Sequence, residues 1–169
     1  HIYGFYFKNR KRPDGSRRPG IQAECGYCRK LQKIKKYNSD PYSYVYRLVQ
    51  LIRQPSALKK GRRPCTMSED EFMKEWKIQF QKTRLTCPKL GIQMTYIGGE
   101  SKVKTNISID RIDSKKDYEK GNVQFVSHIY NIMKQHYTDE EVDKICLLRA
   151  GVIKKELENG QKKVVGGQW

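Results

Sequence analysis

The sequence predicts an α+β fold, in which helices flank a small antiparallel sheet. Helix start signals recur near residues 40, 68 and 138. Between the last two of them, short extended segments alternate with turn residues, as in hairpins. The 169 residues, 37% of them hydrophobic, suffice for one compact domain with an appendage.

The first 63 residues predict a basic arm with one helix. Residues 1–22 are rich in Arg, Lys, Gly and Pro, which favours an extended segment. Asp40 and Pro41 form an N-cap followed by a proline in the first helical turn, so a helix begins there. Its apolar stripe consists of Tyr42, Val45, Tyr46, Val49 and Ile52. A basic loop then separates this arm from residues 64–169.

Residues 64–169 predict the compact domain. Ser68 and Glu71 form a capping box for a helix that ends near Lys82. Its side chains at core spacing are Phe72, Trp76 and Phe80. We interpret this helix as scaffold.

Three extended segments follow, at residues 93–97, 107–112 and 123–126, and two or three of them can pair antiparallel. Gly98 and Gly99 form a turn between the first two. Residues 127–136 predict a short helix. Thr138 and Glu141 form a second capping box, for a helix that ends near Gly151.

The charge predicts a polyanionic partner. The net charge is +17, and residues 1–63 contribute 17 basic against 3 acidic residues, a balance of +14. Like charges at this density repel one another, so an anionic partner relieves the strain. Aromatic residues alternate with the basic ones, which favours nucleic acid over a membrane, because phosphate contacts and base stacking can both form. The expected contact residues are Lys8, Arg10, Lys11, Arg12, Arg17 and Arg18.

The chain has no apolar run of the roughly 18 to 20 residues that spans a bilayer, and no signal-peptide pattern. We therefore expect a soluble, intracellular protein. Its five cysteines are too few and too scattered for a secreted disulfide scaffold.

One pair of cysteines has metal-ligand spacing. Cys25 and Cys28 could hold Zn²⁺ with Cys65 or Cys87 as further ligands, although reduced structural cysteines are the competing interpretation. Cys146 lies among apolar residues of a predicted helix, which favours burial.

Two oxygen-bearing side chains suggest a site for a hard cation. Asp110 ends a β-like segment, and Asn131 lies in the helix that follows. Carboxylate and amide oxygens suit Mg²⁺ or Mn²⁺, which keep positions for water and phosphate. Such a cation polarises a phosphoryl oxygen and stabilises a leaving alkoxide.

A longer string of residues carries a family resemblance. It runs Ser108-Ile109-Asp110-Arg111-Ile112-Asp113, then from Asp117 through Gly121-Asn122-Val123 to Ser127, then Asn131-Ile132-Met133-Lys134. Cys87 to Ile92 precede it and Thr138 to Glu141 follow. Over residues 87–148 the chain resembles the HNH endonucleases of phages and mobile introns. The resemblance implies a ββα-metal finger at about residues 87–136, flanked by helices and the basic, partly extended arm.

The resemblance also implies roles for single residues. Asp110 and Asn131 would bind the metal. Asn122 would brace the loop between the strands and hold the general base. Lys134, one turn beyond Asn131, would face the phosphate backbone.

Arg111 stands where many members of this family have the histidine that activates water. A guanidinium stays protonated and cannot act as a base, but it can bind the scissile phosphate or stabilise transition-state charge. The candidates for the base are Asp113, His128 and a metal-bound water deprotonated by solvent, with His136 a weaker choice. Asp113 has an alternative role as the cap of a turn, and His128 as a structural histidine.

Some members of the family add two Cys-x-x-Cys pairs around the active site. Here Cys87 has no partner cysteine nearby, and Ser127 and Tyr130 stand near the place of the second pair. The resemblance therefore implies that this zinc site has been lost.

The leading interpretation is a metal-dependent DNA endonuclease of homing type that nicks or cuts double-stranded DNA. One alternative is an HNH-fold nucleic-acid-binding protein that has lost cleavage. The other is a basic ribonucleoprotein component, for which RNA would be the partner.

Overall fold

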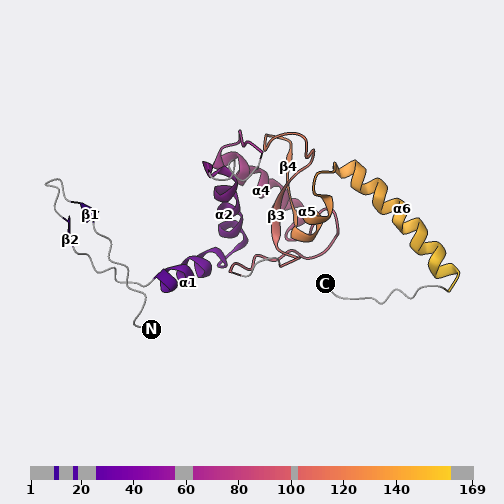
Figure 1. The fold of residues 1–169 in the computed structure, drawn as a ribbon, viewed down its shortest axis with the longest axis horizontal. Coiled ribbons are helices and arrows are strands. Elements are labelled where there is room, and N and C mark those ends of the chain that lie inside the picture. The colour runs from indigo at the N-terminus through magenta and orange to yellow at the C-terminus, as the bar shows by residue number, and fades with distance from the viewer. Residues whose placement is uncertain (1–9, 12–16, 19–25, 56–62, 100–102, 161–169) are drawn as a thin grey trace.

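The computed structural model describes residues 10–11, 17–18, 26–55, 63–99 and 103–160. These residues contain five helices and two antiparallel strand pairs, so the α+β prediction is confirmed (Figure 1). The elements are β1 (Arg10–Lys11), β2 (Arg17–Arg18), α1 (Gly26–Tyr37), α2 (Pro41–Arg53), α4 (Glu69–Thr83), β3 (Ile107–Arg111), β4 (Val123–Ser127), α5 (His128–Lys134) and α6 (Asp139–Glu158).

The N-terminal part has more structure than predicted. β1 and β2 pair antiparallel, with Arg10 opposite Arg18. Two helices, α1 and α2, stand where one was expected. The prediction missed α1 because the first turn of this helix carries no acidic residue and its apolar side chains are sparse among basic ones.

Helix α2 begins where Asp40 and Pro41 predict it. Asp40 Oδ1 accepts a hydrogen bond of 2.8 Å from the backbone N–H of Ser43. Val45 and Val49 are completely buried in the same core as the residues of α4, β3 and β4. The expected boundary after residue 63 therefore does not separate two cores, because α2 belongs to the compact domain.

Helix α4 supplies the scaffold expected of it. Ser68 and Glu71 form the predicted capping box. Phe72 and Trp76 are buried, and the Trp76 ring centroid lies 5.1 Å from that of Phe125 on β4. The Gln79 side chain exchanges hydrogen bonds with the backbone N–H and carbonyl of Phe125, so it occupies the place of a neighbouring strand.

Strands β3 and β4 form an antiparallel pair in which Asp110 lies opposite Gln124. Residues 93–97 do not form the third strand that the sequence allowed, but make only isolated bridges at Gln93 and Thr95. The Asn106 side chain explains this difference. It binds both the backbone N–H and the carbonyl of Ile97, which a third strand would need for pairing.

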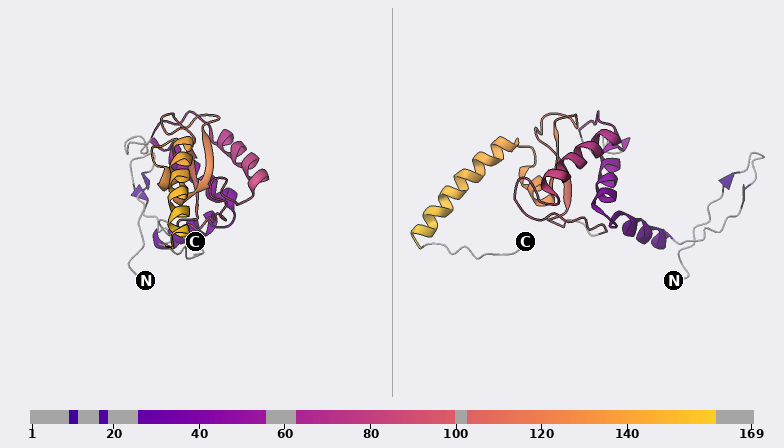
Figure 2. Two further views of the ribbon diagram at one scale, coloured as in Figure 1. Left: turned by 90° about the vertical axis from the view of Figure 1, so that its right-hand side faces the viewer. Right: turned by 180° about the vertical axis from the view of Figure 1, so that it is seen from behind.

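Helix α5 follows β4 directly and packs on both strands. Helix α6 begins at the predicted Thr138 cap but continues past Gly151 to Glu158, since one interior glycine costs a helix only about 1 kcal/mol. It projects from the compact body (Figures 1 and 2). Cys146 on α6 is exposed, which corrects the prediction that it is buried. In the described part of the chain, neither α6 nor another helix is long and apolar enough to cross a membrane.

Candidate functional site

A cavity of about 370 Å³ opens where α5 packs on β3, and we call it the β3–α5 cavity. Its lining residues are Leu48, Leu51, Ile52, Ser108, Ile109, Tyr118, His128, Asn131 and Ile132. The Asn131 amide Nδ2 donates to Ser108 Oγ at 2.7 Å and to the Ile109 carbonyl at 3.2 Å. His128 lies one helical turn before Asn131 and is half-buried. The fold thus brings two residues singled out by the sequence into one cavity.

Arg111 does not line this cavity but contacts Tyr118, a residue that does. Its guanidinium carbon is 5.3 Å from the ring centroid of Tyr118, which lines the cavity. Its Nη1 donates to the Lys116 carbonyl at 2.8 Å. A guanidinium has five N–H donors in a planar fork, so the remaining donors can bind an anion. Among the described residues, this cation is held by its neighbours and no carboxylate forms an ion pair with it.

Asn122 braces the loop between β3 and β4, as the resemblance implies. Its Oδ1 accepts from the backbone N–H of Asp113 at 2.8 Å. Its Nδ2 donates to the carbonyls of Asp113 at 3.1 Å and Asp117 at 2.9 Å. The Asp113 carboxylate itself accepts from the backbone N–H of Lys115 at 2.9 Å. Asp113 therefore has the turn-capping role that was the alternative to its role as a base.

A buried charge cluster joins β3, α5 and α6, and we call it the Lys134 network. Lys134 Nζ is 2.7 Å from Asp110 Oδ2 and 2.9 Å from Asp139 Oδ1, and its side chain is 0% exposed. It also donates to the carbonyls of Arg111 and Ile112. The prediction that Lys134 faces a phosphate backbone therefore does not fit the structure, because two carboxylates and two carbonyls enclose its ammonium group.

Asp139 joins further elements to the Lys134 network. Its carboxylate accepts from Gln124, from the Tyr130 hydroxyl at 2.9 Å, and from Lys89 at 2.6 Å. Burial raises the pKa of Asp139, but the hydrogen bonds from Lys89, Lys134 and its other partners outweigh it and leave the pKa lowered. Burial and then the hydrogen bond to Asp139 raise the pKa of Tyr130. The network thus favours an ionised Asp139.

The donor chemistry at Asp110 and Asn131 fits a hard divalent cation. Both residues lie where β3 meets α5, since Asn131 contacts Ser108 and Asp110 contacts Lys134. Asp110 Oδ2 is occupied by Lys134 and Gln124. Asn131 lines the β3–α5 cavity, whereas Asp110 is buried and is not among the described residues that line it.

The described cysteines do not assemble a zinc site. Cys25 lies outside the described residues, and Cys28 is exposed on α1. Cys87 is buried, and its Sγ accepts from the backbone N–H of Ser127 at 3.3 Å. Ser127 therefore lies beside Cys87, where the resemblance implies a lost pair. The described residues contain no group of three or more His, Cys, Asp or Glu side chains placed to hold a metal.

The structure describes only some of the arm residues that were predicted to contact nucleic acid. Lys8 and Arg12 lie outside the described residues, whereas Arg10, Lys11, Arg17 and Arg18 form β1 and β2. The side chains of these four residues are not among those described.

Sequence reasoning missed several residues of the site. Gln124 was seen only as part of a strand, and Asp139 only as part of a capping motif. Gln124 bonds to Asp110 and Asp139, and Asp139, which comes from a different helix, bonds to Lys134. The one available signal was polar character at strand positions where burial was expected, as at Asp110 and Gln124.

Comparisons with protein-family models, with curated proteins and with solved structures found no match for this chain.

Proposed function

We propose that the protein is a metal-dependent DNA endonuclease of the HNH class, of homing type, acting inside the cell. In this proposal β3, β4 and α5 form the ββα-metal finger. The observation that carries it is the β3–α5 cavity, which brings His128 and Asn131 together, with Arg111 in contact with its lining. The loop brace by Asn122 and the net charge of +17 support it further.

The residues in and beside the cavity have different roles in hydrolysis. The Arg111 guanidinium binds the scissile phosphate and stabilises the negative charge that develops on it. Arg111 cannot remove a proton from water, so a base must come from elsewhere. His128 is the better candidate, because it lines the cavity, whereas the Asp113 carboxylate caps a turn. Asn131 positions the α5 end of the site through its bonds to β3.

Asp110 and Asn131 would hold Mg²⁺ or Mn²⁺, because carboxylate and amide oxygens suit these cations. When bound, the cation would polarise the phosphoryl oxygen and stabilise the leaving group. Lys134 fixes the position of the Asp110 carboxylate through an ion pair with Oδ2.

Plasmid cleavage tests this proposal. Supercoiled DNA is incubated with the protein, with Mg²⁺, with Mn²⁺ or with chelator, and open-circular and linear products are scored. We expect metal-dependent products. Asn131→Ala should remove most of them while DNA binding persists. Asn159→Ala, the same change at an exposed helix end, is the matched control and should cleave normally.

One observation favours a second candidate, an HNH-fold protein that binds nucleic acid without cutting it. The ion pair of 2.7 Å between Lys134 and Asp110 already neutralises the carboxylate expected at the metal. This candidate predicts DNA binding without products at any metal concentration. Preference for RNA over duplex DNA would instead favour the ribonucleoprotein alternative.

A further inference from the structure

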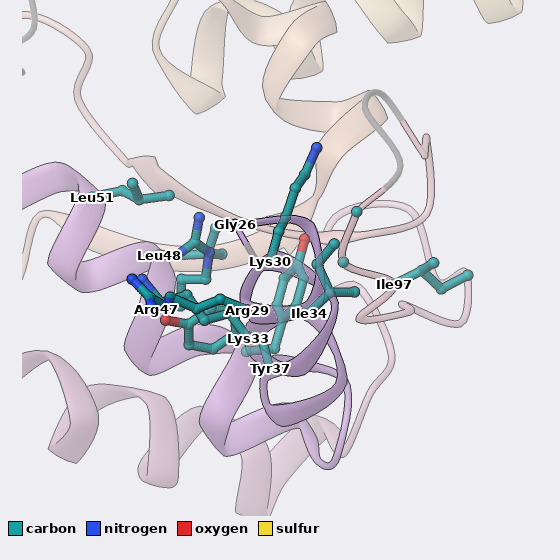
Figure 3. Close-up of a pocket in the computed structure, with 13 residues that line it drawn as sticks. Gly26, Arg29, Lys30, Lys33, Ile34, Tyr37, Arg47, Leu48, Leu51 and Ile97 are labelled. Carbon is teal, nitrogen blue, oxygen red and sulfur yellow. The ribbon is translucent and has the colours of Figure 1, made fainter. Parts of the chain in front are cut away.

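A second cavity lies between α1, α2 and the loop Ile97–Gly99, and we call it the α1–α2 cavity (Figure 3). It measures about 470 Å³, within the range of roughly 300 to 1,000 Å³ typical of small-molecule sites. None of the 13 described residues that line it is acidic. Four of them are cationic: Arg29, Lys30, Lys33 and Arg47.

The wall of this cavity is held in place by side-chain clamps. Asn38 Oδ1 accepts from the Gly98 backbone N–H at 2.5 Å, and its Nδ2 donates to the Gly98 carbonyl at 3.4 Å. Asn106 binds both backbone groups of Ile97. A Cβ atom at Gly98 would lie 2.6 Å from Asn38 Oδ1, so the loop approaches α1 more closely than a larger residue allows. These bonds hold Ile97 and Gly98 in the wall of the cavity.

The lining combines cationic groups with apolar and aromatic surface. The Arg47 guanidinium carbon lies 4.4 Å from the centroid of the Tyr37 ring. Figure 3 shows Tyr37, Arg29 and Arg47 gathered where α1 meets α2. The apolar lining residues are Ile34, Leu48, Leu51 and Ile97. An inorganic anion would use only the cations, whereas a nucleotide would use both, with its phosphate on the cations and its base on the apolar and aromatic surface.

The α1–α2 cavity adjoins the β3–α5 cavity. Leu48 and Leu51 of α2 line both of them. A strand that crosses these two leucines can therefore have one nucleotide in the α1–α2 cavity and a phosphate near Asn131.

We propose that the α1–α2 cavity binds an unpaired nucleotide of the DNA strand that enters the β3–α5 cavity, an inference that rests on the proposed function. The bases of a duplex are stacked inside it, so a base reaches an apolar cavity only from a single-stranded, mismatched or flipped position. The site thus gives the protein a preference for DNA with an unpaired position near the cut.

Binding without cleavage tests the site. Fluorescent 30-mer duplexes, fully paired or with a central mismatch or one-nucleotide bulge, are titrated by anisotropy in chelator at several salt concentrations. Wild-type protein should prefer the unpaired position by roughly tenfold, the value of one stacked base. Lys33→Glu should remove this preference. Lys35→Glu makes the same charge change on the same helix outside the cavity, and it should retain the preference.

A second measurement locates the base directly. A photoreactive 5-iododeoxyuridine at the unpaired position should crosslink to the tyrosines of the cavity, Tyr37 or Tyr44, as mapped by mass spectrometry. Equal losses in Lys33→Glu and Lys35→Glu, no preference in the wild type, or crosslinks only outside α1 and α2 would each overturn the inference. A Lys33-dependent preference in a protein that yields no plasmid products would overturn the proposed nuclease activity but leave the nucleotide site standing.

Discussion

Lys134 Nζ lies 2.7 Å from Asp110 Oδ2, and both side chains are buried, at 0% and 4% exposed. This pair links α5 to β3. Two buried charges lose their hydration, and they are tolerated only where partners satisfy them. Here Asp139, Gln124 and two backbone carbonyls complete the set. The pair therefore positions the carboxylate that the proposed cation needs.

Removing Lys134 should destabilise the fold. Lys134→Ala leaves Asp110 and Asp139 as buried carboxylates without their shared cation, which should cost about 3 to 5 kcal/mol of unfolding free energy. Lys134→Met, which restores apolar volume, should still be destabilised for the same reason. Urea unfolding followed by circular dichroism measures both. Lys144→Ala, at an exposed position on α6, should stay within about 0.5 kcal/mol of the wild type. Wild-type stability in Lys134→Ala would mean that the network does not hold the fold together.

The lowered pKa of Asp139 predicts a dependence of stability on pH. A carboxyl group whose pKa is lower in the folded than in the unfolded state stabilises the fold above its unfolded pKa, near 3.9. That contribution is lost as pH falls through the folded value. Asp139→Asn should therefore be less stable than the wild type at pH 7, and the difference should shrink below about pH 4. Denaturant titrations from pH 7 to pH 3 measure it, with the exposed neighbour Glu140→Gln as control. A difference that grows at low pH would reverse the expected sign.

Asn122 should control the loop between β3 and β4. Asn122→Ala removes three hydrogen bonds from a residue that is 6% exposed, at a cost of about 1 kcal/mol for each bond. The amide of Asp113 loses its acceptor, so its hydrogen exchange should accelerate. Exchange measured by NMR at Asp113, compared with amides within α4, gives the result. Unchanged protection at Asp113 would show that the loop does not depend on this side chain.

The sequence predicted those parts of the fold whose cause is local. The starts of α2, α4 and α6 follow from caps and capping boxes, which involve residues three positions apart. Helix α1 has no such signal. The missing third strand depends on Asn106, nine residues from the Ile97 backbone that it occupies.

The candidate site shows the same division. Asn131 and His128 share a cavity because they lie on one face of α5, and helical spacing predicts this. Lys134 also lies on that helix, and the family resemblance implied that it faces the phosphate backbone. Its true position depends on Asp110 from β3 and Asp139 from α6, which meet it only in the folded chain. Partners that come from distant segments leave no periodic signal in the sequence.

The last prediction concerns Arg111, which stands where many members of the proposed HNH family have a histidine. Its guanidinium is held by the Lys116 carbonyl and the ring of Tyr118, which lines the β3–α5 cavity. If Arg111 stabilises charge on the phosphate, Arg111→Ala should lower the cleavage rate by roughly a hundredfold or more while the affinity for DNA changes less. Arg149→Ala on α6, which removes a guanidinium from an exposed ion pair, should leave the rate unchanged.

In the same assay, the pH profile separates a histidine base from deprotonation of bound water by solvent. A histidine base gives a rate that rises through about pH 6.5 and then levels, whereas deprotonation of bound water by solvent keeps the rate rising. Because Arg111 stays protonated throughout, Arg111→Ala should lower the whole profile without shifting it. Arg111→His adds a base at the family's usual position and should retain or raise activity. A profile that shifts in Arg111→Ala would show that Arg111 acts on the base, and not on the phosphate.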